Sequence, residues 1–125
     1  MPTPDLRRQR NILLTTYRRD GSPVGTAVNV AVNDHHAYIR TWASSGKAKR
    51  IARNPKVTVA PCTGRGTQTG PAATATARLL QGDEEGAAAK LIDSKYPILQ
   101  GVLVHLAHRI RRLRTVHYEL TFEQE

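Results

Sequence analysis

Residues 40–56 read RTWASSGKAKRIARNPK, and the rest of the chain is organised around this stretch. It holds six of the nineteen Lys and Arg residues and no acidic residue. A strand-like run leads into Ser44-Ser45-Gly46, and a short basic helix pattern follows that Asn54-Pro55 ends. Backbone N–H groups at the helix start, the positive end of the helix dipole and several cationic side chains would all point to one place. The stretch therefore predicts an anion site of the kind that binds a phosphate.

Apolar residues within this helix pattern indicate which side is buried. Ala48, Ile51 and Ala52 stand at helical spacing, so we expect them to face the sheet, with the cations on the other sides. A charge run of this kind is most often a solvated helix face. The Ser-Ser-Gly entrance is an argument for a binding role, but without a resemblance to a family of known function it does not outweigh the solvated face.

The segments around the helix have the pattern of β-strands joined by turns. Residues 11–17 are rich in β-forming residues and lead to Asp20-Gly21, a strong hairpin signal. In residues 24–32 bulky Val and Thr alternate with small Gly and Ala and with Asn, so one face leaves room for a flat ligand. Further strands are predicted over residues 37–42, 56–62, 72–80 and 115–122, with a glycine-rich hairpin over residues 63–71.

The connections between these elements predict the fold class. Strands joined by tight turns pair antiparallel, and a small antiparallel sheet removes its exposed edges by curling into a barrel. The basic helix falls between the third and fourth strands, and one or two helices, starting near residues 82 and 99, precede the sixth. No linker or shift in composition divides the chain. We therefore predict one mainly β domain over residues 1–125, a six-stranded antiparallel barrel with residues 1–10 as a flexible N-terminal arm.

The composition limits the class of partner and the compartment. A formal net charge of +9 and a pI near 10.5 favour an anionic partner: nucleic acid, an acidic membrane surface or a polyanionic small molecule. The single cysteine, Cys62, excludes an internal disulfide and fits a reducing cytoplasm. The N-terminal residues lack the apolar core of a signal peptide, and no run approaches the roughly 20 apolar residues of a membrane span. We expect a soluble, cytoplasmic protein.

Four of these segments, in order, resemble the pyridoxamine-phosphate-oxidase-like split β-barrel superfamily. They are LLTTYRRDGSP (13–23), SGKAKRI (45–51), VTVAPCT (57–63) and GPA (70–72). Within the superfamily, the chain is most similar to the actinobacterial flavin/deazaflavin oxidoreductases of the B type, which use the deazaflavin coenzyme F-420. The resemblance runs from residue 11 to residue 122. It implies a split barrel that forms a homodimer, with two cofactor sites at the subunit interface.

The resemblance also implies which residues bind the cofactor. It assigns the phosphate and the poly-glutamate tail to Ser45, Gly46, Lys47, Lys49, Arg50 and Ile51. It lays the deazaflavin ring along Val24, Gly25, Thr26, Ala27 and Val28. Two pairs at the ends of the third and fourth strands would flank the same cavity: Arg40 and Thr41, and Pro61 and Cys62. Relatives often carry Pro-Val-Trp where this chain has Ala27-Val28-Asn29, so the substrate side of the ring differs here.

The activity that the resemblance implies asks little acid–base chemistry of the protein. Hydride transfer is a property of the reduced deazaflavin, and the barrel must orient it against an acceptor and exclude water. An obligate hydride donor points to a conjugated small-molecule acceptor of the enone, quinone or tetrapyrrole type. No catalytic residue is assigned. Two alternatives stay open. The cofactor could be flavin mononucleotide (FMN) in place of F-420, and the protein could carry the cofactor without catalysing a reaction.

Other motifs carry weaker signals. His35 and His36 read as turn residues, and no third ligand stands at zinc-like spacing, so no metal site is predicted. Cys62 has no His or Asp near it in the sequence that would activate a nucleophile. Six of the ten residues 105–114 are His or Arg, on an amphipathic helix pattern over residues 98–114 that could touch nucleic acid or an acidic membrane. Against nucleic acid, the chain has only six aromatic residues and no helix-turn-helix pattern.

Overall fold

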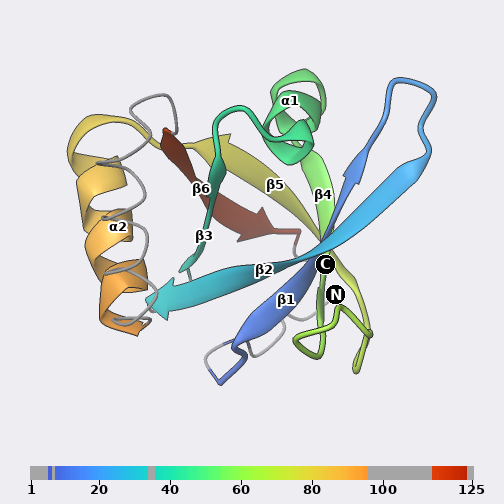
Figure 1. The fold of residues 1–125 in the computed structure, drawn as a ribbon, viewed down its shortest axis with the longest axis horizontal. Coiled ribbons are helices and arrows are strands. Elements are labelled where there is room, and N and C mark those ends of the chain that lie inside the picture. The colour runs from blue at the N-terminus through green and yellow to red at the C-terminus, as the bar shows by residue number, and fades with distance from the viewer. Residues whose placement is uncertain (1–5, 7, 34–35, 96–113, 124–125) are drawn as a thin grey trace.

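Antiparallel strands close into a barrel in the computed structural model of this chain, which describes residues 6, 8–33, 36–95 and 114–123. Around the barrel the strands follow the order β1-β2-β3-β6-β5-β4 (Figure 1). The strands are β1 (Asn11–Tyr17), β2 (Pro23–Asn33), β3 (His36–Trp42), β4 (Lys56–Pro61), β5 (Ala73–Leu79) and β6 (Thr115–Phe122). The predicted mainly β, six-stranded antiparallel barrel is confirmed for the part of the chain that is described.

Alternation along each strand decides what fills the barrel. Ile12, Leu14 and Thr16 of β1 point inward and are almost fully buried, whereas the residues between them are half-exposed. On β5 the inner positions are alanines, and the larger inner side chains of β6, such as Leu120 and Phe122, lie on the neighbouring strand. Small and large residues therefore share the interior, as close packing of a narrow barrel requires.

Helix α1 (Gly46–Arg53) connects β3 to β4 at one end of the barrel (Figure 1). Ala48 and Ile51 are buried beneath it, as the sequence predicts. The prediction for Ala52 is wrong, because Ala52 is exposed. The helix has only eight residues, and its buried face consists of Ala48 and Ile51. Ala52 follows Ile51 directly and is therefore rotated about 100° from it around the helix axis, out of the buried face.

Helix α2 (Gly82–Lys95) lies outside the barrel, against β2, β3 and β6 (Figure 1). Most of the predicted basic helix over residues 98–114, and His35 of the predicted turn, fall outside the described residues. Within the predicted N-terminal arm, Leu6 is buried in the core. None of the helices in the described parts combines the length and the apolar character that crossing a membrane requires.

Candidate functional site

Ser45 forms the N-cap of α1 and shapes the site at its start. Its Oγ accepts a hydrogen bond from the backbone N–H of Ala48 at 3.1 Å and lies 3.2 Å from Oγ1 of Thr41, which is buried. The N–H groups of Gly46 and Lys47 have no acceptor within the described part of the chain. The start of α1 therefore presents backbone donors and the positive end of the helix dipole.

Arg50 brings a second positive charge to the same place. Its Nε donates a hydrogen bond of 2.7 Å to Oγ1 of Thr16, a fully buried residue of β1. The guanidinium then lies against Gly46, since a Cβ built on that glycine would stand 2.7 Å from Nη1 of Arg50. A cation beside the positive end of a helix is electrostatically unfavourable unless an anion lies between them. The geometry therefore fits an anion placed between Arg50 and the start of α1.

Within the described part of the chain, the cations of α1 are not neutralised by acidic side chains. No carboxylate of the described residues forms an ion pair with the basic residues of α1, which are Lys47, Lys49, Arg50 and Arg53. By contrast, Arg40, Lys56 and Arg78 each pair with an acid. Lys49 and Arg53 are exposed and Lys47 is half-buried. The positive potential of this end of the barrel is thus available to a partner.

Strand β1 joins this anion site to the predicted ring-binding strand. Thr16, which holds Arg50, stands opposite Val24 of β2. At the other end of β1, Ile12 stands opposite Val28 of β2 on one side and Pro61 of β4 on the other. The α1 cations and Pro61 therefore lie toward opposite ends of one three-stranded surface.

The outer face of that surface carries small side chains. Gly25 and Ala27 of β2 are exposed on it, and the neighbouring positions of β1 are the half-exposed Thr15 and Leu13. A Cβ on Gly25 would lie 3.2 Å from Cδ1 of Leu13, so a larger residue there would crowd β1. The exposed part of this surface therefore carries few bulky side chains.

Other predicted contacts on β2 and α1 point into the barrel. Val28 and Ile51 are core residues, so a ligand outside the barrel could meet only their backbone. The Oγ1 atom of Thr26 is also buried, and it has no hydrogen-bond partner in the part of the chain that is described. Val24 is half-buried on the same inner face.

Pro61 and Cys62 lie where β4 passes into the glycine-rich loop. Cys62 forms an isolated bridge with Gln68, and Gly70 packs on Pro61 closely enough that a Cβ would stand 2.7 Å from the proline Cγ. This hairpin-like return agrees with the predicted loop. Burial raises the pKa of the Cys62 thiol, which therefore stays protonated at neutral pH.

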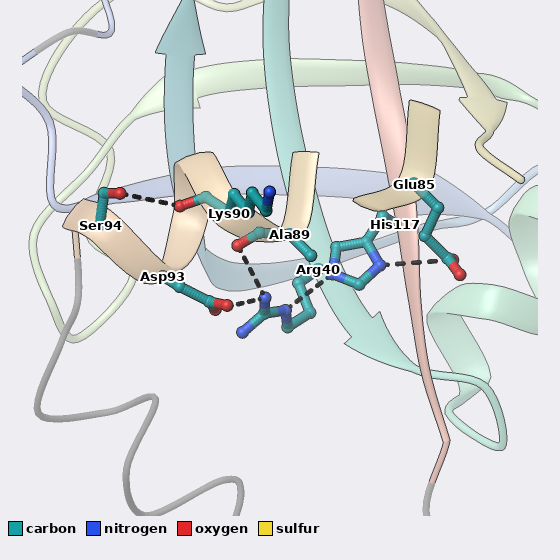
Figure 2. A network of polar contacts seen from close by, with 7 residues as sticks. All are labelled: Arg40, Glu85, Ala89, Lys90, Asp93, Ser94 and His117. Atoms are coloured by element: carbon teal, nitrogen blue, oxygen red, sulfur yellow. Dashed lines mark hydrogen bonds and ion pairs between the residues drawn. The ribbon is translucent and has the colours of Figure 1, made fainter. Parts of the chain in front are cut away.

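Arg40 is held away from the α1 cations. Its Nε donates to Nε2 of His117 at 2.9 Å, and its Nη2 donates to Oδ1 of Asp93 at 2.7 Å (Figure 2). His117 lies on β6 and Asp93 on α2, so the Arg40 side chain is engaged beneath α2. The other residue of the pair at the end of β3, Thr41, lies at the start of α1, with its Oγ1 beside Oγ of Ser45.

Sequence reasoning missed Thr16, Leu13 and Thr15 of β1, and His117 of β6. The signal for Thr16 was a hydroxyl at an inward position of an otherwise aliphatic alternation. For His117 it was an ionisable side chain in the alternation of the last strand, on the face opposite the apolar residues. Neither pattern names the partner, which is Arg50 of α1 for Thr16 and Arg40 of the neighbouring strand β3 for His117.

Comparisons with known proteins agree with this architecture. The sequence model of the family described as Pyridoxamine 5'-phosphate oxidase matches residues 5–117. No match is found among the curated proteins.

Solved structures with the same fold bear varied names. A conserved hypothetical protein from Mycobacterium tuberculosis has a TM-score of 0.69 and 21% identity, covering 95% of this chain and 76% of its own. The heme storage protein of Vibrio cholerae has a TM-score of 0.68 and 14% identity, with coverage of 94% and 84%. A structure named F-420 reductase has a TM-score of 0.56 and 17% identity, with coverage of 95% and 90%. At these identities the likeness shows a shared fold.

Proposed function

Because this chain belongs to the pyridoxamine 5'-phosphate oxidase family, we propose that it is an oxidoreductase that binds coenzyme F-420 and passes hydride from it to a conjugated small-molecule acceptor. The family supports a flavin-type cofactor, and the neighbour named F-420 reductase supports the deazaflavin. The single observation that carries the proposal is the Arg50 guanidinium held by Thr16 against the start of α1. That arrangement fits a phosphate ester.

The residues present fit both ends of such a cofactor. The phosphate would lie at Ser45, Gly46 and Arg50, where donors converge. The tail, a chain of carboxylates, would follow Lys47 and Lys49, whose charges are uncompensated among the described acids. The ring would lie on the outer face of β2, where small residues leave space.

The reaction needs orientation more than acid–base catalysis. When bound, reduced F-420 supplies the hydride. The chain would fix the cofactor by its anionic end and present a flat surface that excludes water from one side of the ring. We assign no catalytic acid or base to the chain, and the acceptor class stays enone, quinone or tetrapyrrole.

A second copy of the chain belongs to this proposal. The outer face of β2 is open in the single chain, with Gly25 and Ala27 exposed. A surface open on one side cannot by itself enclose a ring. We propose that a homodimer supplies the other wall, and that Pro61 and Cys62 border the cavity at the far end of β1 from α1.

A cofactor titration tests the proposal. Oxidised F-420 is added to the purified protein and its fluorescence is followed at several salt concentrations, with FMN titrated in parallel. We expect micromolar or tighter binding of F-420 that weakens as salt rises. Absence of F-420 binding, or clear preference for FMN, would reject the deazaflavin assignment.

A carrier is separated from an enzyme by turnover. The same protein is mixed with reduced F-420 and a panel of enone, quinone and tetrapyrrole acceptors. Oxidation of the cofactor that depends on both protein and acceptor supports the reductase. Tight binding without turnover by any acceptor class supports a carrier.

A gel shift on random duplex DNA tests the nucleic-acid alternative. We expect no shift of the DNA at the protein concentrations that bind cofactor.

Paired charge removal tests where the anion binds. We predict that Lys47→Ala with Arg50→Ala weakens F-420 binding by about tenfold or more, because charge-assisted hydrogen bonds are removed. The matched control, Lys56→Ala with Arg78→Ala, removes the same charge from cations that are paired with acids and should change affinity by less than about threefold. Equal effects from the two pairs would mean that binding depends on diffuse charge.

A further inference from the structure

Helix α2 attaches to the barrel through polar contacts as well as apolar ones. Ala88 and Ile92 are its fully buried residues among those described. Beside them, Glu85, Ala89 and Asp93 recur every four residues and so share one helix face. That face lies toward β3 and β6 (Figure 2). How firmly the helix is docked therefore depends on these polar groups as well as on its apolar cluster with the barrel.

Arg40 is the centre of these contacts. From β3 it reaches the helix twice, with Nη2 2.7 Å from Oδ1 of Asp93 and 3.3 Å from the carbonyl oxygen of Ala89. Its Nε lies 2.9 Å from Nε2 of His117 on β6. The Arg40 side chain is only 12% exposed, so solvent weakens these interactions little.

These contacts fix the protonation state of His117. A guanidinium stays protonated in proteins, so Nε of Arg40 must donate, and Nε2 of His117 must accept with its lone pair. The imidazole is then neutral with its proton on Nδ1. That nitrogen lies 3.4 Å from Oε2 of Glu85, which is the acceptor available to it. In the docked arrangement both ring nitrogens of His117 have a partner, while Arg40 donates to His117, Asp93 and Ala89.

A second proton on His117 would break this arrangement. It would go to Nε2 and place two N–H groups face to face at 2.9 Å, in a site where His117 is 4% exposed. The charged groups of the described residues that face the ring are Arg40 from β3 and Glu85 and Asp93 from α2. Burial, together with the charge of Arg40, lowers the pKa of His117 despite the opposing effect of the two carboxylates. The repulsion between the two N–H groups is relieved only if the Arg40 side chain or the His117 ring moves away.

We propose that Arg40 and His117 form an acid-released latch for α2. With His117 neutral, Arg40 is held in line with Asp93 and Ala89 and the helix is docked. With His117 protonated, Arg40 is displaced and α2 loosens from β3 and β6. This latch lies apart from the α1 anion site, and it does not depend on the identity of the cofactor.

The direction of the pH dependence follows from proton linkage. The docked state holds His117 less basic than its ordinary value of 6.5, so the released state binds more protons. Docking is therefore most stable above that value. It weakens as the pH falls below it, until His117 is protonated in the docked state as well.

Hydrogen exchange of the whole protein between about pH 8 and about pH 5 tests the latch. After correction for intrinsic exchange rates, we expect protection of the α2 amides to fall by about threefold or more at the acid end, while β1 and β4 change little. In His117→Gln the amide oxygen can accept from Arg40 but does not titrate, so protection should no longer depend on pH. The control His36→Gln alters an exposed histidine on β3 and should keep the wild-type response.

Three results would overturn the latch. One is protection of the α2 amides that does not change with pH in the wild type. Another is a decline of that protection at acid pH in His117→Gln that equals the decline in the wild type.

If that variant does not fold, nitrogen NMR of the wild-type imidazole decides the question. A proton on Nδ1 at about pH 8, joined by one on Nε2 as protection is lost, supports the latch. A proton on Nε2 at about pH 8 excludes it.

Discussion

Thr16 determines where Arg50 points, and its hydroxyl can be removed without changing the shape of the side chain. Thr16→Val deletes the acceptor of the 2.7 Å bond from Nε of Arg50. We predict a loss of about 1–3 kcal/mol in the free energy of unfolding, because a polar group in a protected site loses its partner. F-420 affinity should fall by about fivefold, since the guanidinium is no longer held over Gly46. Urea denaturation and cofactor titration measure the two effects.

Two further variants separate the hydroxyl from general damage to a strand. Thr16→Ser keeps the acceptor and should retain affinity even if it loses some stability. Thr76→Val makes the same change at an exposed position of β5 and should alter neither quantity. If Thr16→Val binds cofactor as tightly as the wild type, Thr16 does not position Arg50.

At the scale of single residues, prediction from the sequence succeeded where the two interacting residues are close together in the chain. Ser45 as the helix cap could be identified because the cap and its helix are adjacent in the chain. Thr16 is 34 residues from Arg50, and their contact depends on how α1 settles on β1. Arg40 shows the same limit. Alternation places it on the outer face of β3, but it does not reveal that α2 covers that face.

Within helix α1, Gly46 provides a test of the close approach of Arg50. Gly46→Ala should not destabilise the helix, because alanine has the higher helix propensity, but its Cβ would stand 2.7 Å from Nη1 of Arg50. The guanidinium must therefore move, and we predict that F-420 binding weakens by about threefold or more. Thermal unfolding and titration are the measurements.

The matched control for that variant lies in α2. A Cβ on Gly86 meets nothing within 4 Å, so Gly86→Ala should gain about 0.5–1 kcal/mol of stability and leave cofactor affinity unchanged. Unaltered affinity in Gly46→Ala would show that Arg50 does not need its present position to bind the anion.

At the scale of elements, the alternation of residues predicted which strands exist and which side of each faces the core better than it predicted where each strand ends. The bounds of β1 and β6 agree with the sequence prediction. Strand β4 ends at Pro61, one residue early, because Cys62 pairs only with Gln68 in an isolated bridge. A strand end depends on where its partner stops pairing, and the sequence of one strand does not contain that information.

Across the whole molecule, the sequence predicted a closed barrel but not the order of its strands. Strand β6 pairs with β5, the strand before it in the chain, but also with β3, and it lies opposite β1 in the barrel. Net charge likewise did not show where the excess lies. Among the described residues, Arg40, Lys56 and Arg78 each pair with an acid, while the cations of α1 form no ion pair with a described carboxylate. These are long-range properties that follow only from the closed topology.

The proposed homodimer makes a prediction about the open face of β2. Ala27 is exposed at the middle of the small-residue surface, so Ala27→Arg should prevent a second copy from packing there. We expect the wild type to sediment at twice the mass of the 13.8 kDa chain, and the variant at that mass, still folded by circular dichroism. F-420 binding should be lost with the dimer, because each copy completes the other's site. Thr121→Arg, at an exposed position of β6, which does not pair with β2, should remain a dimer and bind normally. A wild type that binds F-420 as a monomer would show instead that one chain is sufficient and that the face of β2 serves another purpose.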